Sequence, residues 1–248
     1  MQIIVDDLLV TYEQNGKGKL LLLLHGWADD HKTFDYLLSS LSKKYQVMAL
    51  DLPGFGDSQS PNEVWNLDNY TRFIAAFLMK LKLNPYAIIG HSNGGALAIR
   101  GLSDGVLKAD KLVLLASAGI RNTNKTKRLV TKIVAKVGKI STFWLPKLTR
   151  QQLRRKLYGT IGSDMLVAPH LQETFKLTVS QDLQDDASKL NLPTLLINAD
   201  RDPAIPISDA KLFNKLIKGS KLVVLESTSH FIHQEKNAEV VKIIEDFL

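Results

Sequence analysis

The sequence predicts an α/β fold with a mostly parallel central sheet flanked by helices. Short apolar runs, typical of buried strands, alternate along the chain with segments of helical periodicity. The run of five leucines at 20–24 is continuously apolar, as expected of a strand whose two faces are both covered. With 248 residues, 45% of them hydrophobic, the chain is long enough to bury one large core and to carry an insertion.

The expected elements follow that alternation along the chain. Two short strands, at 3–5 and 8–12, are joined by a turn at Asp6 and Asp7. Further strands are expected at 19–26, 45–51, 86–90, 111–117, 192–200 and 221–227. Helices are expected at 31–43, 67–83, 93–104, 208–217 and 236–247. Asp68 is a predicted N-cap of the second helix, because a short acidic side chain can accept the first free backbone N–H groups.

Residues 119–188 are predicted to form a helical cap, inserted into an α/β core that comprises 1–118 and 189–248. The insertion has helical periodicity and no convincing strand pattern. In its first part, apolar residues fall on one face of the predicted helix and basic residues on the other, at steps of three and four. The basic residues of that face are Lys125, Arg128, Lys132, Lys136 and Lys139.

Positive charge is concentrated in this insertion. The chain has a formal net charge of +7, but residues 121–163 hold twelve Lys or Arg and no Asp or Glu. Such a segment can be plain solvated surface, or it can attract an acidic protein, an anionic acyl substrate or an anionic membrane surface. Binding of nucleic acid is not expected, because aromatic residues and Gly-rich loops are not interleaved with the basic residues.

The composition excludes several other classes of site. The chain has no cysteine, which removes disulfides, thiolate catalysis and Cys-based metal sites. No apolar run approaches the length of about 18 residues that a transmembrane helix needs, so no transmembrane segment is expected. The first residues lack the basic and long apolar regions of a signal peptide, and we expect a cytoplasmic protein.

One segment, AIIGHSNGGALAIRG at 87–101, indicates a nucleophile. It fits Gly-x-Ser-x-Gly and lies between a predicted strand and a predicted helix, where a tight turn strains the backbone of Ser92 and projects its hydroxyl at the carboxyl edge of the sheet. Side chains at the glycine positions would collide with the neighbouring strand and helix. The helix N-terminus points its partial positive charge at the serine, and the backbone N–H of Asn93 can bind an oxyanion.

A nucleophilic serine needs a base and an orienting acid, expected in the chain order Ser, Asp or Glu, His. His230 follows the last predicted strand, on a loop at the carboxyl edge of the sheet. His233 is the alternative base, and we expect it to begin the final helix and to face sideways. Asp202 lies in the loop after the preceding strand, and Asp200 is the alternative acid, whose other role would be that of a turn residue.

Five segments in this order resemble motifs of the α/β-hydrolase superfamily, and the resemblance covers nearly the whole chain. HGWADD resembles the family's oxyanion loop, DLPGFGDS its Asp-x-Pro-Gly-x-Gly-x-Ser loop, and GHSNGG its nucleophile elbow. ADRDPAIP resembles the acid loop, which implies Asp202 as the acid, and SHFIHQE resembles the histidine segment, which implies His230 as the base. Ala199 and Ser229 replace two glycines usual in those segments, and neither change removes a catalytic group.

The resemblance implies an α/β-hydrolase fold and a serine hydrolase that cleaves carboxylic esters through an acyl-enzyme, with no metal or cofactor. Its substrate would be a small-molecule ester. In this reading the backbone N–H groups of Trp27 and Asn93 bind the oxyanion. His25, beneath the oxyanion loop, and His91, beside the serine, would have packing roles.

Other activities stay open within this superfamily. Dehalogenases and epoxide hydrolases of this fold use aspartate at the elbow. Ser92 at that position argues against both activities. Carbon–carbon bond hydrolases often carry Gly-Asn-Ser-Met-Gly, so they are a weaker alternative. A catalytically idle ligand receptor is a further alternative, although the intact Ser-Asp-His set favours an enzyme. Residues 21–58 resemble esterases that cleave methyl esters of acyl-carrier-protein intermediates, whose protein partner is very acidic.

Overall fold

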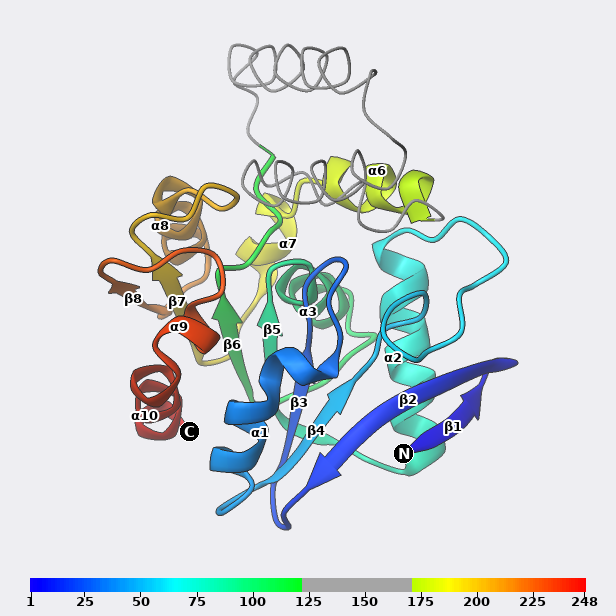
Figure 1. The fold of residues 1–248 in the computed structure, drawn as a ribbon. Helices are drawn as coiled ribbons and strands as arrows, with labels where there is room; N and C mark the ends of the chain where they lie inside the picture. The colour runs from blue at the N-terminus through cyan, green and yellow to red at the C-terminus, as the bar shows by residue number, and fades with distance from the viewer. Residues whose placement is uncertain (122–170) are drawn as a thin grey trace, which may run out of the picture.

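A computed structural model describes residues 1–121 and 171–248, and the helices predicted between 122 and 170 lie outside the described residues. Its centre is an eight-stranded sheet of order β1-β2-β4-β3-β5-β6-β7-β8 (Figure 1). The strands are β1 (Gln2–Val5), β2 (Leu8–Asn15), β3 (Leu20–Leu24), β4 (Gln46–Leu50), β5 (Pro85–His91), β6 (Lys111–Leu115), β7 (Thr194–Ala199) and β8 (Lys221–Leu225). The pairings of β1 with β2 and of β2 with β4 are antiparallel and the other five are parallel, which confirms the predicted sheet.

Helices cover both faces of this sheet (Figure 1). They are η1 (His31–Phe34), α1 (Asp35–Leu41), α2 (Leu67–Leu81), α3 (Asn93–Ser103), α6 (Gln172–Ser180), α7 (Gln184–Lys189), α8 (Ile207–Leu216), α9 (Ile232–Glu235) and α10 (Asn237–Phe247). A short 3₁₀ turn followed by α1 replaces the single helix expected over 31–43. The one-turn helix α9 was not expected from the sequence, and it lies just after His230.

Two apolar clusters lie on the two faces of the sheet, and β3 contributes to both. Leu21 and Leu23 belong to the cluster that contains the apolar side chains of α1 and α10. Leu22 and Leu24 belong to the cluster that contains those of α2, α3 and α8. This alternation follows from the two-residue period of a strand, and it confirms that the run of leucines is covered on both sides.

The start of α2 differs from the expectation. Asn66, not Asp68, is the N-cap: its side chain accepts the backbone N–H of Asn69, and the side chain of Asn69 accepts the backbone N–H of Asn66. This reciprocal pair satisfies two of the free N–H groups at the helix start. Asp68, two residues after the N-cap, instead binds Arg100 of α3 with a distance of 2.7 Å between its carboxylate oxygen and Nε.

The two ends of the predicted insertion meet beside α3. The backbone N–H of Leu183 donates to the carbonyl of Gly119 at 2.8 Å. One turn later, the carboxylate of Asp186 in α7 lies 3.2 Å from the guanidinium of Arg100. The side chain of Leu183 is fully buried in the cluster on the α2–α3 face. Helix α7 is therefore attached to the core, while the predicted extent of the cap, 119–188, stays a prediction.

No helix within 1–121 and 171–248 is long and apolar enough to cross a membrane.

Candidate active site

The turn between β5 and α3 holds Ser92 in a strained conformation. Its backbone has φ 51° and ψ −115°, a region that side-chain-bearing residues rarely adopt. The backbone N–H of Ser92 donates to Leu115 of β6 at 3.0 Å, and its carbonyl accepts the N–H groups of Gly95, Ala96 and Ala118. These bonds fix the turn against the next strand and hold the serine at the carboxyl edge of the sheet.

Three glycines make room for this turn. A Cβ at Gly94 would lie 2.0 Å from the carbonyl oxygen of Leu24, at the end of β3. A Cβ at Gly90 would lie 2.6 Å from the backbone of Gly94, and one at Gly95 would lie 2.3 Å from the hydroxyl of Ser117. The predicted reason for glycines on both sides of the serine, collision with the adjacent strand and helix, is confirmed.

His230 and Asp202 are paired across two loops at the same edge. Nδ1 of His230 lies 2.7 Å from Oδ2 of Asp202, and because a carboxylate only accepts, the ring donates from Nδ1. The Asp202 side chain is fully buried, and its Oδ1 accepts the backbone N–H groups of Ala204 and Ile205 at 2.7 and 2.9 Å. These bonds fix the carboxylate, and the proton on Nδ1 leaves Nε2 of His230 as the nitrogen that can accept a proton.

Asp200, the alternative acid, is used elsewhere. Its carboxylate accepts the backbone N–H of Thr228 at 3.2 Å, at the turn that leads to the histidine loop. Hydrogen bonds from the backbone of Ser227 and then Thr228 hold the pKa of Asp200 below its usual value. Its carboxylate therefore shapes the loop that carries His230, whereas Asp202 meets the ring itself.

His233, the alternative base, lies within the short helix α9 and is buried. Its Nε2 lies 3.0 Å from the hydroxyl of Thr33 in η1. Burial, followed by the charge of His230, lowers the pKa of His233 to about 3. The structure thus pairs Asp202 with His230 and places His233 against η1.

The loop after β3 lies directly against the elbow. A Cβ at Gly26 would lie 3.3 Å from Cβ of Ser92, so the backbone that leads into Trp27 passes beside the serine. Asn93 is the first residue of α3, and the first N–H groups of a helix have no partner within it. Within the described ranges, no backbone hydrogen bond engages the N–H of Trp27 or of Asn93. These two backbone N–H groups are therefore available to donate to a ligand near Ser92.

The loop after β3 is held by His25 and by aromatic side chains. Nε2 of His25 accepts the backbone N–H of Leu52, in the loop after β4, and its Nδ1 donates to the carbonyl of Gly26. Burial lowers the pKa of His25, which favours the neutral ring that these two bonds require. The ring of Trp27 packs against those of Phe55 and Phe175, with centroids 4.8 and 5.0 Å apart. His25 therefore has the packing role that we expected.

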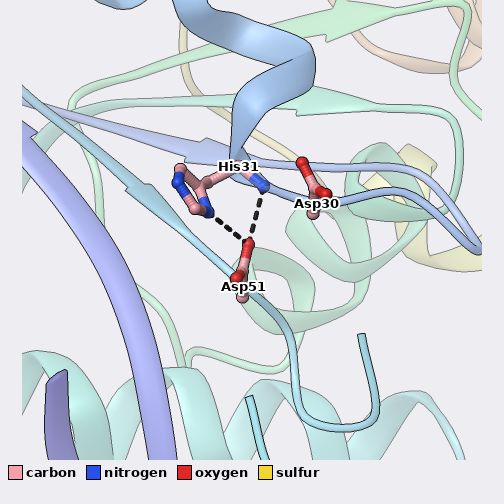
Figure 2. A group of neighbouring side chains, drawn as sticks. All are labelled: Asp30, His31 and Asp51. Atoms are coloured by element: carbon pink, nitrogen blue, oxygen red, sulfur yellow. Dashed lines mark hydrogen bonds and ion pairs between the residues drawn. The ribbon is translucent and has the colours of Figure 1, made fainter. Parts of the chain in front are cut away.

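A second cluster beside the site joins Asp30, His31 and Asp51 (Figure 2). Both the backbone N–H and Nδ1 of His31 donate to the same oxygen of Asp51, each at 2.7 Å, as Figure 2 shows. The other oxygen of Asp51 accepts the N–H of Asp57 at 3.0 Å. Asp30 accepts the N–H of Lys32 and so caps η1.

Within the described ranges, Asp30, His31 and Asp51 form the group whose potential metal-ligand atoms are close enough to bind one cation. These atoms lie within 4.8 Å of one another. Those atoms are already committed to each other and to the backbone, and Nδ1 of His31 carries the proton that it donates. The cluster acts as a clamp between η1 and the loop after β4, which is the DLPGFGDS segment.

One contact near the serine was not expected. The ring of His91, the residue before Ser92, reaches the backbone carbonyl of His230, with 3.0 Å between Nε2 and the oxygen. The sequence places these residues 139 positions apart. The position of His91 inside the Gly-x-Ser-x-Gly motif is the only signal that could have drawn attention to it.

A family model decides the membership of this chain. The model described as "Serine aminopeptidase, S33" matches residues 16–237, which include the elbow and both loops of the Asp202–His230 pair.

The chain belongs to this family of α/β-hydrolases.

Relatives of the same superfamily match over nearly the whole chain. "AB hydrolase superfamily protein YisY" of Bacillus subtilis is 27% identical over 95% of this chain and 93% of its own. "Pimeloyl-[acyl-carrier protein] methyl ester esterase" of Aeromonas hydrophila subsp. hydrophila is 25% identical over 96% and 99%. "2-hydroxy-6-oxo-2,4-heptadienoate hydrolase" of Pseudomonas putida is 24% identical over 94% and 90%.

A solved structure confirms the α/β-hydrolase fold. The esterase EaEST from Exiguobacterium antarcticum is 20% identical, and its fold matches with a TM-score of 0.76 over 100% of this chain and 98% of that one. Family, relatives and fold together support a hydrolase of the α/β-hydrolase type that resembles esterases.

Proposed function

We propose that this α/β-hydrolase cleaves carboxylic esters, with Ser92 as nucleophile, His230 as general base and Asp202 as the orienting acid. The observation that carries the proposal is the 2.7 Å bond between His230 and Asp202, at the sheet edge where the strained elbow presents Ser92. Among the described residues the hydroxyl of Ser92 makes no hydrogen bond. No existing hydrogen bond therefore has to break before this hydroxyl reacts. Catalytic bonds between serine and histidine are often long before substrate binds, and they shorten in the complex.

The acylation step follows from these positions. Oγ of Ser92 attacks the carbonyl carbon of the ester while Nε2 of His230 takes its proton, and the imidazolium then gives that proton to the departing alcohol. Asp202 stabilises the imidazolium, because its fixed carboxylate faces the protonated Nδ1. The backbone N–H groups of Trp27 and Asn93 bind the negative oxygen of the tetrahedral intermediate.

Deacylation repeats the chemistry with water. His230 removes a proton from a water molecule, which attacks the acyl-enzyme, and the collapse of the second intermediate returns a proton to Ser92 and releases the carboxylic acid. The same two N–H groups stabilise both intermediates. In this scheme every proton transfer passes through Nε2 of His230, and no step needs a metal or a cofactor.

The substrate is a small-molecule ester, and two observations bear on its acyl group. Aromatic rings of Trp27, Phe55 and Phe175 gather beside the oxyanion loop, which favours an apolar acyl portion. The basic segment 121–163, most of which lies outside the described residues, favours an anionic acyl substrate or an acidic carrier protein. The similarity to an acyl-carrier-protein methyl ester esterase supports this second possibility. A cytoplasmic location stays a prediction.

A second candidate is cleavage of a carbon–carbon bond. It is favoured by the 24% identity to a 2-hydroxy-6-oxo-2,4-heptadienoate hydrolase, a protein named for a dienoate substrate. The elbow of the present chain has His91 and Asn93 around the serine, which departs from the Gly-Asn-Ser-Met-Gly of many such enzymes. An idle ligand receptor is the remaining candidate, and the paired His230 and Asp202 argue against it.

The deciding experiment is a panel of p-nitrophenyl esters of increasing acyl length, with a 2-hydroxy-6-oxo-dienoate assayed beside it. We expect turnover of the esters, labelling of the protein by a fluorophosphonate, and loss of both in Ser92→Ala. Losses on the order of a thousandfold or more are usual when a catalytic serine is removed.

Ser117→Ala is the matched control, because Ser117 is also a buried serine at the carboxyl edge of a strand. It should stay within a few-fold of wild type. Faster turnover of the dienoate than of every ester would favour the second candidate. Absence of both activities and of labelling would leave the idle ligand receptor as the remaining candidate.

A further inference from the structure

His91 links the nucleophile elbow to the loop of the base. Its Nε2 lies 3.0 Å from the backbone carbonyl oxygen of His230, and since a carbonyl only accepts, His91 donates from Nε2. Nδ1 of His91 is then unprotonated, and it is buried with no hydrogen-bond partner in the described part of the chain. A Cβ at Gly26 would lie 3.1 Å from that Nδ1, so the ring is also packed against the oxyanion loop.

Three imidazole rings lie together behind Ser92. The ring of His91 is 4.8 Å from that of His230 and 4.5 Å from that of His233, measured between centroids. His91 and His233 are both buried, whereas the side chain of His230 is 16% exposed. Burial, with the neighbouring His233 and His230, lowers the pKa of His91 well below its usual value. The ring of His91 that lies beside His230 is therefore neutral.

We propose that His91 is a positioning residue for the base: its hydrogen bond to the His230 carbonyl ties the loop that carries His230 to the residue next to Ser92. The inference rests on the proposed function, because it assigns His91 a role only if His230 is the base. It goes beyond the packing role expected for a residue beside the nucleophile.

The rest of the histidine loop explains why a second attachment is needed. Asp202 holds the ring of His230 through Nδ1, and this bond sets the tautomer and the ring direction. Behind it, Thr228 is held by Asp200 and Ser229 by Glu235, through their backbone N–H groups. The bond from His91 is the one that joins the backbone of His230 itself to the residue next to Ser92. Without it, the loop can move away from the serine while the pair with Asp202 stays intact.

The substitution His91→Phe tests this role, because it keeps a buried flat ring and removes the donor. A displacement of about 1 Å in a catalytic group can cost about a hundredfold in rate. We expect kcat for a p-nitrophenyl ester to fall by roughly tenfold to a hundredfold while KM stays within threefold, since the side chain of His91 is buried. The rate of fluorophosphonate labelling should fall by the same factor, because it also depends on activation of Ser92.

Two further variants separate positioning from packing. His91→Gln retains an N–H donor and should recover most of the lost kcat. His233→Phe removes the other buried imidazole, which has no hydrogen bond to His230, and should keep kcat within threefold. The positioning role is overturned by wild-type kcat in His91→Phe, by equal losses in both His91 variants, or by an equal loss in His233→Phe.

A measurement on the unaltered protein covers the case in which a variant fails to fold. Nitrogen NMR of histidine-labelled wild type should show His91 neutral and protonated at Nε2 at pH 7, and the Nδ1-protonated form would overturn the bond. Failure of the proposed function is distinct from both results. It would appear as absence of esterase activity and of labelling in the wild type, whatever the tautomer of His91.

Discussion

The carboxylate of Asp202 is shared between a ring and a turn: Oδ2 lies 2.7 Å from Nδ1 of His230, while Oδ1 accepts two backbone N–H groups. Asp200, two residues earlier, accepts the backbone N–H of Thr228 instead. Replacement of the carboxylate by an amide should therefore affect activity differently at the two positions.

Asp202→Asn should lower kcat/KM by about a thousandfold or more, because an amide cannot hold the same tautomer and cannot stabilise the imidazolium. Asp200→Asn should stay within tenfold, since only a turn contact is weakened. Ester hydrolysis by the two purified variants, compared after their unfolding temperatures are measured, checks the pair. A larger loss in Asp200→Asn than in Asp202→Asn would identify Asp200 as the acid.

His230→Ala should abolish esterase activity to the same degree as Ser92→Ala, because every proton transfer in the proposed scheme uses this ring. His233→Ala should keep activity within tenfold but should lower the unfolding temperature, since the buried ring and its contact with Thr33 are lost. Initial rates and melting curves on the same samples distinguish the two effects. The reverse ranking of the rates would make His233 the base.

Acid should destabilise the fold through its buried histidines. His25, His91 and His233 are neutral when folded, because burial lowers the pKa of each. The unfolded chain takes up these protons at a pH of about 6.5. The folded state therefore binds fewer protons, and its stability is lost as the pH falls below about 6.5, for His233 down to about 3.

The slope is at most about 1.4 kcal/mol per pH unit for each histidine. Urea unfolding at pH 7.5 and 5.5 should show the loss, and His233→Phe should reduce the difference between the two pH values by about 1 kcal/mol. Ser117→Ala removes no titrating group and should retain the wild-type difference. Equal stability at both pH values would show that the histidines do not remain neutral in the fold.

Gly94→Ala should destabilise the fold by about 3 kcal/mol or more, because the added Cβ would lie 2.0 Å from the carbonyl oxygen of Leu24. Gly105→Ala is the control: Gly105 has φ 70° and open space around it, so the cost is backbone strain of about 1 kcal/mol. Chemical denaturation of both variants measures the difference. Similar losses of stability in the two variants would show that the backbone around Gly94 can move to accept the added Cβ.

The basic segment should act on the encounter with anionic substrates. Replacement of Lys132, Lys136 and Lys139 by Gln should leave kcat/KM for a neutral p-nitrophenyl ester unchanged. It should lower kcat/KM for the p-nitrophenyl half-ester of a dicarboxylic acid. The gap should close as salt rises, because exposed charges are screened over about 10 Å at 0.1 M.

The control for that experiment removes the same charge at the other edge of the sheet. Lys43, Lys80 and Lys108 are exposed and precede the amino ends of β4, β5 and β6. Their replacement by Gln should leave both substrates unaffected. Equal rates for the two substrates in wild type at low salt would identify the basic segment as plain solvated surface.

The sequence by itself determined the alternation of elements, the parallel sheet and the place of Ser92 in the turn between a strand and a helix. These features depend on local patterns: the period of apolar residues sets strand or helix, and the glycines around Ser92 allow only a tight turn there. The same patterns placed Asp202 and Asp200 on one loop and His230 and His233 on another. Spacing alone left both members of each pair open, and the resemblance to the α/β-hydrolase motifs implied Asp202 and His230.

The tertiary structure decided that question, because side-chain direction within an irregular loop depends on contacts distant in the chain. Backbone N–H groups of Ala204 and Ile205 turn Asp202 toward His230, and the unexpected helix α9 turns His233 toward Thr33. The bond from His91 to the His230 carbonyl joins residues 139 positions apart, and no local pattern encodes it. It exists because β5 and the loop after β8 end at the same edge of the sheet.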